Sequence, residues 1–503
     1  MASTKSYDCI VIGSGQGGTP LAAALAQSGR KTALIERSHI GGCCVNEGCT
    51  PTKTMIASGQ IAHLAGRAGE YGIWQTESCP TYNALRGQSD HQVATLEGAE
   101  KIRPVTDMLK VRQRKRDIVE SFRGGSEKRL KGIEGLEVIM GEAKFIGPKC
   151  MSVQPGDGGA FEVTAETFFI DAGERPSRPE LSGLDDVEAG DCKDRVLNST
   201  TIMELDAVPL HLVVLGGGYI GMEFGQLFHR LGSKVTIIQK GKQLLPREDA
   251  RVAEEVRKIC TGDGMEVVLN AKASSIHVDR FKDEPLQLVY TSADGMTKTV
   301  PGSHLLLAAG RVSNADSLAL DTAGVKLDAR GHIVINERLE TDVPHIFALG
   351  DIKGGPAFTH ISYDDYRIIK ANFIDKVAAP LTITDRQVPY VVFMDPQLAH
   401  IGLHEHEARA KFPTRTIKTA TMPMAWVARA IETDETRGMM KAVVDAETEE
   451  ILGFTMLGKE GGEIMSLVQV AMMGKLKYGQ LQNATFAHPT LAESLNNLWG
   501  SLE

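Results

Sequence analysis

One local pattern occurs twice in this chain of 503 residues: an apolar strand, a glycine-rich turn, a helix and a second apolar strand. The first copy spans 7–36, YDCIVIGSGQGGTPLAAALAQSGRKTALIE, and the second spans 211–240, HLVVLGGGYIGMEFGQLFHRLGSKVTIIQK. Continuous apolar runs of this kind are typical of parallel strands that are buried on both faces. The repeated pattern favours an α/β chain with two dinucleotide sites over an all-β sandwich.

The glycines of the first copy follow the spacing G-x-G-x-x-G, at Gly13, Gly15 and Gly18, and Glu36 ends the second strand. The first glycine permits a tight turn, and the second lets the backbone approach a pyrophosphate. The third lets the helix pack closely on the strand, while the carboxylate can accept a hydrogen bond from a ribose hydroxyl. We expect these four residues to bind a dinucleotide whose ribose carries no phosphate.

The second copy differs at the end of its second strand. Its glycines keep the same spacing: Gly216, Gly218 and Gly221. Where the first copy has an acid, this one has Gln239, followed by the cations Lys240 and Lys242. Loss of the acid and gain of positive charge favour a 2′-phosphate, and therefore NADPH over NADH. The alternative is that these lysines are simply exposed.

The charge and the apolar pattern argue against several classes of partner. A formal net charge of −9 and a pI near 5.9 disfavour nucleic-acid binding. The densest basic run, KVRQRKR at 110–116, has the spacing of a solvated helix face. No apolar run is long enough to cross a membrane, and the N-terminus leads directly into the first strand. We expect a cytoplasmic protein.

Three of the eight cysteines fall within seven positions of the segment 41–53, GGCCVNEGCTPTK. They could form a metal site, a structural disulfide or a redox pair. Zinc requires about four ligands, and the remaining cysteines are isolated, so we predict no metal. The segment leads into a predicted helix, whose first turn lowers the pKa of a nearby thiol. A redox pair is favoured, because two close thiols can store two electrons.

Five motifs occur in the order that one known family shows: GSGQGG…E, GGCCVNEGCTPTK, GGGYIGME, ALGD and HPTLAES. Together they resemble the pyridine nucleotide–disulfide oxidoreductases, which include glutathione reductase, lipoamide dehydrogenase and mercuric reductase. The resemblance covers essentially the whole chain, and FTHISYDDYRI and AHPTLAESLNNL are most similar to the catalytic core of mercuric reductase. It implies two Rossmann-like domains, for FAD and NAD(P)H, and a C-terminal α+β dimerisation domain. The expected divisions are 1–173 (FAD, first part), 174–304 (NAD(P)H), 305–383 (FAD, central part) and 384–503 (dimerisation).

The resemblance also implies roles for the residues around the thiols. Cys49 corresponds to the thiol beside the flavin, and Cys44 to the interchange thiol that attacks the substrate. Lys53 and Glu223 correspond to an ion pair near the flavin N5. Tyr219 corresponds to the aromatic gate that covers the flavin until the nicotinamide binds.

Other positions are implied to hold the cofactor or to complete the site. Gly350 and Asp351 correspond to the segment that binds the flavin ribityl chain, and Arg311 lies in a strand exit similar to the family's G-R-x-P-N. Gly42, of the glycine pair before the cysteines, is expected to contact the cofactor. His488, oriented by Glu493, corresponds to an acid–base supplied by the partner subunit, so the active site would require a homodimer.

The chain departs from the family at Cys43, where threonine is usual, and it ends without the cysteine pair of mercuric reductase. We therefore expect an NADPH-dependent reductase of a small disulfide or thiol-reactive acceptor. The alternatives are a mercuric ion reductase, a dithiol oxidase of the lipoamide dehydrogenase type and a flavoprotein component of a larger assembly. The polar segment 74–104 is expected to be an insertion that either shapes the substrate mouth or forms a disordered loop, and in a larger assembly it would be the docking element.

Overall fold

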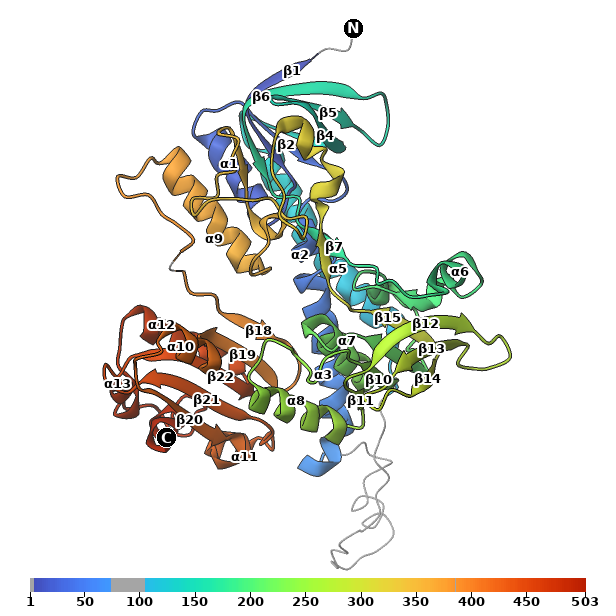
Figure 1. Cartoon of the computed structure of the whole chain (residues 1–503), viewed down its shortest axis with the longest axis vertical. Coiled ribbons are helices and arrows are strands. Elements are labelled where there is room, and N and C mark those ends of the chain that lie inside the picture. Colours follow the sequence, from blue (N-terminus) through green and yellow to red (C-terminus); the bar gives the residue numbers. More distant parts are fainter. Residues whose placement is uncertain (1–3, 74–104, 385) are drawn as a thin grey trace, which may run out of the picture.

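Three parts surround one long helix in the structure, a computed structural model that describes residues 4–73, 105–384 and 386–503 (Figure 1). The long helix is α3 (Cys49–Gly66), and it runs through the middle of the molecule. The expected insertion at 74–104 lies outside the described residues. Since α3 begins at one of the clustered cysteines, the helix connects the thiols to all three parts.

The N-terminal part is built on a sheet with the strand order β3-β2-β1-β6-β5-β4, in which β17 also pairs with β6. Its strands are β1 (Lys5–Ile12), β2 (Thr32–Glu36), β3 (Leu136–Met140), β4 (Glu142–Gly147), β5 (Cys150–Gln154), β6 (Phe161–Ile170) and β17 (Ile346–Ala348). The strands β1, β2, β3, β6 and β17 run parallel, and Ile10 and Val11 of β1 are completely buried. Its helices are α1 (Gly18–Gln27), α5 (Met108–Lys131) and α9 (Thr359–Ile369).

The second part contains a parallel sheet of order β11-β10-β9-β15-β8. Its strands are β8 (Val196–Leu197), β9 (His211–Leu215), β10 (Lys234–Ile238), β11 (Glu266–Val268) and β15 (His304–Leu307), with helices α6 (Leu184–Ala189), α7 (Tyr219–Leu231) and α8 (Ala250–Gly262). An antiparallel sheet adjoins it: β12 (Lys272–Val278), β13 (Leu286–Thr291) and β14 (Thr297–Gly302). Because β15 pairs with β9, the second sheet extends past the expected division at residue 304.

An antiparallel pair, β7 (Glu174–Pro176) and β16 (Arg311–Ser313), links the first two parts. The C-terminal part is an antiparallel sheet of order β18-β19-β22-β21-β20. Its strands are β18 (Tyr390–Val392), β19 (Gln397–Gly402), β20 (Ile417–Pro423), β21 (Met439–Asp445) and β22 (Ile451–Gly458). Its helices are α10 (Glu405–Lys411), α11 (Ala428–Glu432), α12 (Gly461–Met473), α13 (Tyr478–Gln482) and α14 (Ser494–Leu498).

Two parallel α/β layers and a C-terminal α+β part confirm the expected fold class. The first two parts meet where α3 packs against α7. A Cβ atom on Gly59 of α3 would lie 2.7 Å from Cδ1 of Leu227 of α7, so the glycine permits the close approach. Met55 and Ile56 of α3 share one buried cluster with Phe224 of α7. This packing positions the thiols against the second nucleotide fold.

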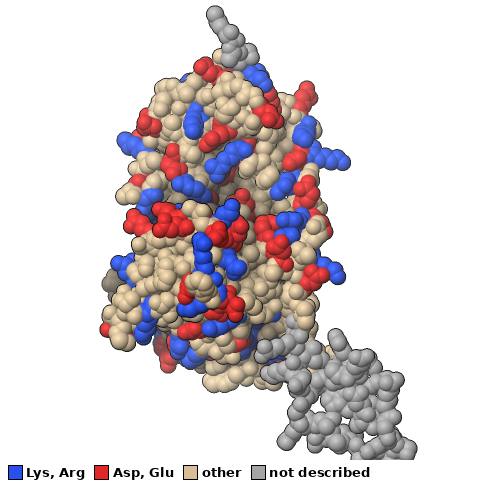
Figure 2. All heavy atoms as spheres, turned by 90° about the vertical axis from the view of Figure 1, so that its right-hand side faces the viewer, with Lys and Arg blue, Asp and Glu red and all other residues tan. Residues whose placement is uncertain are grey.

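The visible face in Figure 2 carries lysine, arginine, aspartate and glutamate side chains in a mixed distribution, with no extended region of one sign. Among the helices in the described part of the chain, none has both the length and the apolar character needed to cross a membrane.

Candidate active site

A cavity of about 1300 Å³ lies where the three parts meet. Its walls include Gly13 from the first glycine turn, Gly218 from the second, Cys44 and Cys49 from the thiol segment, and Met465 from the C-terminal part. Both turns and both thiols therefore face one cavity, as an electron path between two bound dinucleotides requires.

The thiol pair lies on two consecutive helices, with Cys44 in α2 (Gly42–Asn46) and Cys49 at the first position of α3. The two side chains share a hydrogen bond, and Cys49 Sγ lies 3.4 Å from Oγ1 of Thr359. The bond from Cys44 is the largest cause that lowers the pKa of Cys49 to about 5, with help from Thr359 and Lys53. The same bond, and then burial, raises the pKa of Cys44. At neutral pH the pair therefore holds one thiolate, at Cys49, and one proton, at Cys44.

The described cysteines are all free thiols. Among the described residues, no group of three or more histidine, cysteine or acidic side chains is arranged to hold a metal ion.

Lys53 and Glu223, which are 170 positions apart in sequence, form an ion pair of 2.8 Å beside the thiols. The other carboxylate oxygen of Glu223 accepts a hydrogen bond of 2.8 Å from the backbone N–H of Phe393. The Lys53 ammonium also lies 5.0 Å from the centre of the Phe393 ring. The ion pair thus joins α3, α7 and the C-terminal part at one wall of the cavity.

The first glycine turn has the backbone geometry that a bound FAD pyrophosphate needs. Gly13 has a φ of +97°, and a Cβ atom there would lie 2.3 Å from the carbonyl oxygen of Asp171. A Cβ atom on Gly18 would lie 2.2 Å from the carbonyl oxygen of Gly13, and one on Gly42 would lie 2.6 Å from Cα of Gly15. No larger residue fits these positions, so the cradle depends on glycine.

The polar groups around this turn also fit FAD. Glu36 accepts hydrogen bonds from the backbone N–H of Ser14, at 3.0 Å, and from its hydroxyl, at 2.7 Å. Asp351 lines the cavity, and burial raises its pKa to about 6. The N–H of Gly350 donates to Asp365 at 2.9 Å, which holds the turn before Asp351 in place. Acceptors for ribose and ribityl hydroxyls therefore face the cavity beside the glycine cradle.

The second turn repeats the geometry of the first. Gly216 has a φ of +117°, and a Cβ atom on Gly221 would lie 2.0 Å from the carbonyl oxygen of Gly216. Gln239 accepts from the N–H of Gly217 at 3.0 Å. Lys240 is exposed beyond the strand end, and Arg247, which sequence reasoning missed, lines the cavity. The residues present fit a pyridine nucleotide.

Tyr219, the first residue of α7, lines the cavity and is stacked on Tyr390, with ring centres 5.6 Å apart. Its hydroxyl donates to Glu248 at 3.1 Å. The ring therefore lines the cavity directly after Gly218 of the second glycine turn.

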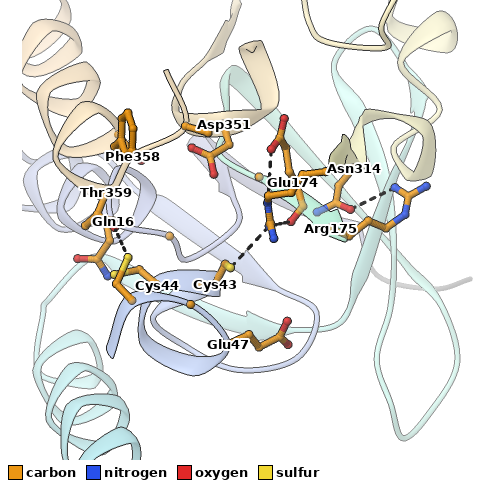
Figure 3. A pocket seen from close by; sticks show the side chains of 18 of the residues that line it. Gln16, Cys43, Cys44, Glu47, Glu174, Arg175, Asn314, Asp351, Phe358 and Thr359 are labelled. Carbon is orange, nitrogen blue, oxygen red and sulfur yellow. Dashed lines mark hydrogen bonds and ion pairs between the residues drawn. The ribbon is translucent and has the colours of Figure 1, made fainter. Parts of the chain in front are cut away.

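Cys43 lies on the cavity wall with Cys44 and Glu174, as Figure 3 shows, and Arg311 contacts it. Arg311 Nη2 is 3.7 Å from Cys43 Sγ and donates to the backbone oxygen of Glu174 at 2.6 Å. Arg311 therefore braces the loop around the thiols, and its side chain points at the third cysteine.

His488 and Glu493 form the expected pair, because both carboxylate oxygens of Glu493 lie 3.0 Å from His488 Nδ1. The His488 side chain is 72% exposed, and it is not among the described residues that line the cavity of its own chain. An acid–base role for His488 therefore requires a second copy of the chain.

Two other contacts in the site were missed by sequence reasoning. Thr359 contacts Cys49, although the two residues are 310 positions apart. The buried carboxylate of Asp171 accepts from the N–H of Gly18 at 2.6 Å. Asp171 had a signal in the sequence, because it is an acid directly after the apolar run of β6. Thr359 lies in the FTHISYDDYRI segment, but that segment does not indicate a contact with a thiol 310 positions away.

Comparisons with known proteins agree with this geometry. Residues 7–365 match the model of the pyridine nucleotide-disulphide oxidoreductases, and residues 388–498 match the dimerisation domain of the same family. The probable pyridine nucleotide-disulfide oxidoreductase RclA of Escherichia coli is 33% identical over 98% of this chain and 99% of its own.

Other relatives carry different activities. A mercuric reductase of Bacillus cereus is 32% identical over 97% of this chain and 70% of its own. A dihydrolipoyl dehydrogenase of Thermus scotoductus is 32% identical over 98% and 96%, respectively. Among solved structures, the Cu(II) complex of the HOCl-induced flavoprotein disulfide reductase RclA from Escherichia coli has a TM-score of 0.83. It is 32% identical and covers 99% of both chains.

The two family matches span nearly the entire chain, and the family works with FAD and a pyridine nucleotide as a homodimer. Together with the paired thiols at the shared cavity, they show that this chain belongs to the pyridine nucleotide-disulfide oxidoreductases and is an oxidoreductase of the flavoprotein disulfide reductase type.

Proposed function

We propose that this protein is an NADPH-dependent reductase of a small disulfide or other thiol-reactive acceptor. One observation carries the proposal: the Cys44–Cys49 pair, already polarised into one thiol and one thiolate, faces the same cavity as both glycine turns. Bound FAD would supply a carrier that accepts two electrons from a nicotinamide and delivers them to a disulfide. The residues of the chain then carry out the reaction with the acceptor.

The thiol pair accounts for the reduction of a disulfide acceptor. Cys44, as a thiolate, attacks one acceptor sulfur, so that the acceptor S–S bond breaks and a mixed disulfide forms. Cys49 then attacks Cys44, which releases the second acceptor thiolate and closes the Cys44–Cys49 disulfide. The acceptor has gained two electrons, and the pair has lost them.

Proton transfer is the step that requires the dimer. Cys44 holds its proton because of its hydrogen bond to Cys49, so a base must remove that proton before Cys44 attacks. We assign this role to the partner's His488, which then protonates the first leaving thiolate. The second thiolate takes its proton from water. Glu493 orients His488 through the two contacts at Nδ1 and leaves Nε2 for the exchange.

NADPH is the preferred donor in this proposal because the second strand end carries no acid. Gln239 is neutral, Lys240 is exposed next to it and Arg247 lines the cavity. A carboxylate at position 239 would repel a 2′-phosphate, whereas a lysine and an arginine attract one.

A soft metal ion is the second candidate acceptor. Its support is that a solved relative is a Cu(II) complex and that other relatives are mercuric reductases. Cys43 adds a third sulfur near the pair, and thiolates bind such ions strongly. The disulfide acceptor stays first because the Cys44–Cys49 pair can reduce it by thiol–disulfide exchange without a third ligand.

Anaerobic titration with NADPH, followed by parallel turnover assays, tests these proposals. The acceptors would be glutathione disulfide, lipoamide, a small aromatic disulfide, HgCl₂ and CuCl₂, with NADH as the alternative donor. Rapid turnover of one disulfide, lost in Cys44→Ser, supports the first proposal. Turnover of a metal salt alone supports the second, and failure of NADPH to reduce the flavin overturns both.

A further inference from the structure

A buried carboxyl group, Glu248, lies directly behind the ring of Tyr219. Its side chain has no exposed surface, and one of its oxygens, Oε1, accepts hydrogen bonds from the hydroxyls of Tyr219, at 3.1 Å, and of Tyr390, at 2.8 Å. The other oxygen, Oε2, is buried with no hydrogen-bond partner. Burying a carboxyl group with one oxygen unpartnered lowers the stability of the fold, which suggests that Glu248 has a function at this position.

The two tyrosines connect Glu248 to the redox site. Tyr390 stacks on Tyr219 on one side and on Phe358 on the other, with ring centres 5.7 Å apart in the second pair. Phe358 is followed by Thr359, which contacts Cys49. A change in the hydrogen bonds of Glu248 would therefore alter how the Tyr219 and Tyr390 rings are held next to the cavity.

The groups that face Glu248 leave it without a cation of its own. Tyr219 comes from α7, Tyr390 from β18, and His404, whose Nε2 lies 3.9 Å from Oε2, from the start of α10. The remaining charged neighbours are Arg247, Asp249, Glu407 and Lys441. Lys441 is engaged by Asp249, at 2.8 Å, and by Glu405, at 2.7 Å.

We propose that Glu248 is a positioning residue that latches Tyr219 in the closed position, and that loss of its charge loosens the latch. The inference rests on the proposed function and on the gate role that the family resemblance implies for Tyr219, in which the ring moves aside for a nicotinamide. As a carboxylate, Glu248 holds the hydroxyl of Tyr219 through a charge-assisted bond, and as a neutral acid it holds the hydroxyl more weakly.

The environment sets the pH at which the latch changes. Burial, with a smaller contribution from Asp249 and Glu407, raises the pKa of Glu248 to about 7, and the bonds from Tyr390 and Tyr219 oppose the rise. Burial also lowers the pKa of His404, so the imidazole is neutral at this pH and does not stabilise the carboxylate. The latch is therefore tight above about pH 7 and loose below it, and nicotinamide binding should weaken as the pH rises.

The test measures the NADPH dependence of flavin reduction from about pH 6 to about pH 8. In the wild-type protein, the apparent Kd for NADPH should rise about five-fold across this range, because a charge-assisted bond replaces a weaker one. Glu248→Gln keeps an oxygen acceptor but cannot titrate, and Tyr219→Phe removes the hydroxyl while keeping the ring. Both variants should lose the pH step, and the double variant should show no further change.

Tyr290→Phe is the matched control, because Tyr290 is a buried tyrosine on β13 of the same part and does not line the cavity. This variant should keep the pH step of the wild-type protein. Any pH effect that comes from titration of the 2′-phosphate of NADPH should be the same in all variants. Flavin content and thermal unfolding report whether each variant is folded, and Tyr219→Phe keeps the test decisive if Glu248→Gln does not fold. A full pH step in either variant, or additive effects in the double variant, would overturn the latch. If NADPH does not reduce the wild-type flavin at any pH, the proposed function itself has failed.

Discussion

The two dinucleotide folds have the same backbone geometry at their glycine turns, and they differ in the side chains at two strand ends. In each, the first glycine has a positive φ and faces a carbonyl oxygen from a neighbouring strand end, that of Asp171 in the first fold and of Ala308 in the second. Hypothetical Cβ atoms on Gly13 and Gly216 would lie 2.3 and 2.4 Å from these oxygens. The turn itself therefore cannot tell one dinucleotide from another.

The differences lie in the side chains at the strand ends. The first fold has the acids Glu36 and Asp171, and Asp171 already accepts from the N–H of Gly18 at the start of α1. The second fold has Gln239 and Ala308 at the corresponding places, and Arg247 on its cavity wall. The glycine spacing is therefore common to both folds, whereas the two strand-end side chains differ between them.

The largest expected effects come from filling the third glycine of each fold. Gly18→Ala places a methyl group 2.2 Å from the Gly13 carbonyl oxygen, so the variant should be purified with at least about ten-fold less flavin. Gly221→Ala meets the Gly216 oxygen at 2.0 Å and should keep its flavin but lose reduction by NADPH. Flavin absorbance relative to protein and stopped-flow reduction measure the two effects.

Gly125→Ala, on α5, is the control for these variants, because a Cβ atom there meets nothing within 4 Å. It should retain both flavin and reduction. If Gly221→Ala also loses the flavin, the two folds do not act as separate binding units.

Only the first fold leads into a thiol segment. The reactivity of that segment should follow the pKa of Cys49, which is lowered to about 5. In the reduced protein, alkylation of Cys49 by iodoacetamide should be constant near neutral pH and slow about ten-fold for each pH unit below about 5, as the thiolate is protonated. Cys44→Ala removes the main hydrogen bond and should move this transition to higher pH. Mass spectrometry of the alkylated peptide measures both, and an unchanged transition in Cys44→Ala would contradict the shared-proton arrangement.

Exchanging the strand-end residues tests the comparison directly. Gln239→Glu should raise the KM for NADPH about ten-fold and lower that for NADH, because a carboxylate repels a 2′-phosphate and accepts from a free ribose hydroxyl. Glu36→Gln should weaken FAD binding by about 1–2 kcal/mol, since the charge-assisted bonds from Ser14 are lost. Steady-state kinetics with both donors measure the first effect, and flavin release in titrations measures the second. Equal changes in the KM for NADPH and for NADH would show that residue 239 does not set the choice of donor.

The smallest effect is expected at Lys240, whose side chain is exposed. Lys240→Ala should raise the KM for NADPH about two- to five-fold at low salt and leave NADH unchanged, since an exposed charge is screened. The difference should shrink at high salt. An effect of the same size on NADH would place Lys240 outside the 2′-phosphate site.

Much of the site could be predicted from the sequence because its parts are local. The glycine cradles, the polarised thiol helix and the His488–Glu493 pair each lie within a few tens of residues. Arg247 was missed because its segment has no motif of its own, and Thr359 was missed because its segment, FTHISYDDYRI, does not indicate a contact with Cys49. The role of Glu248 was equally hidden, since its partners Tyr219 and Tyr390 lie 29 and 142 positions away.

The apolar runs, the glycine spacing and the clustered cysteines were enough to predict the fold class, the two dinucleotide turns and a candidate pair of redox thiols. Steric rules within a few residues dictate where only glycine fits, and apolar runs dictate which strands are buried. Only the tertiary structure decided which distant groups meet: Lys53 with Glu223, Cys49 with Thr359, and Tyr219 with Glu248. Such meetings depend on how α3, α7 and the C-terminal sheet pack, and packing is a property of whole surfaces that no short stretch of sequence contains.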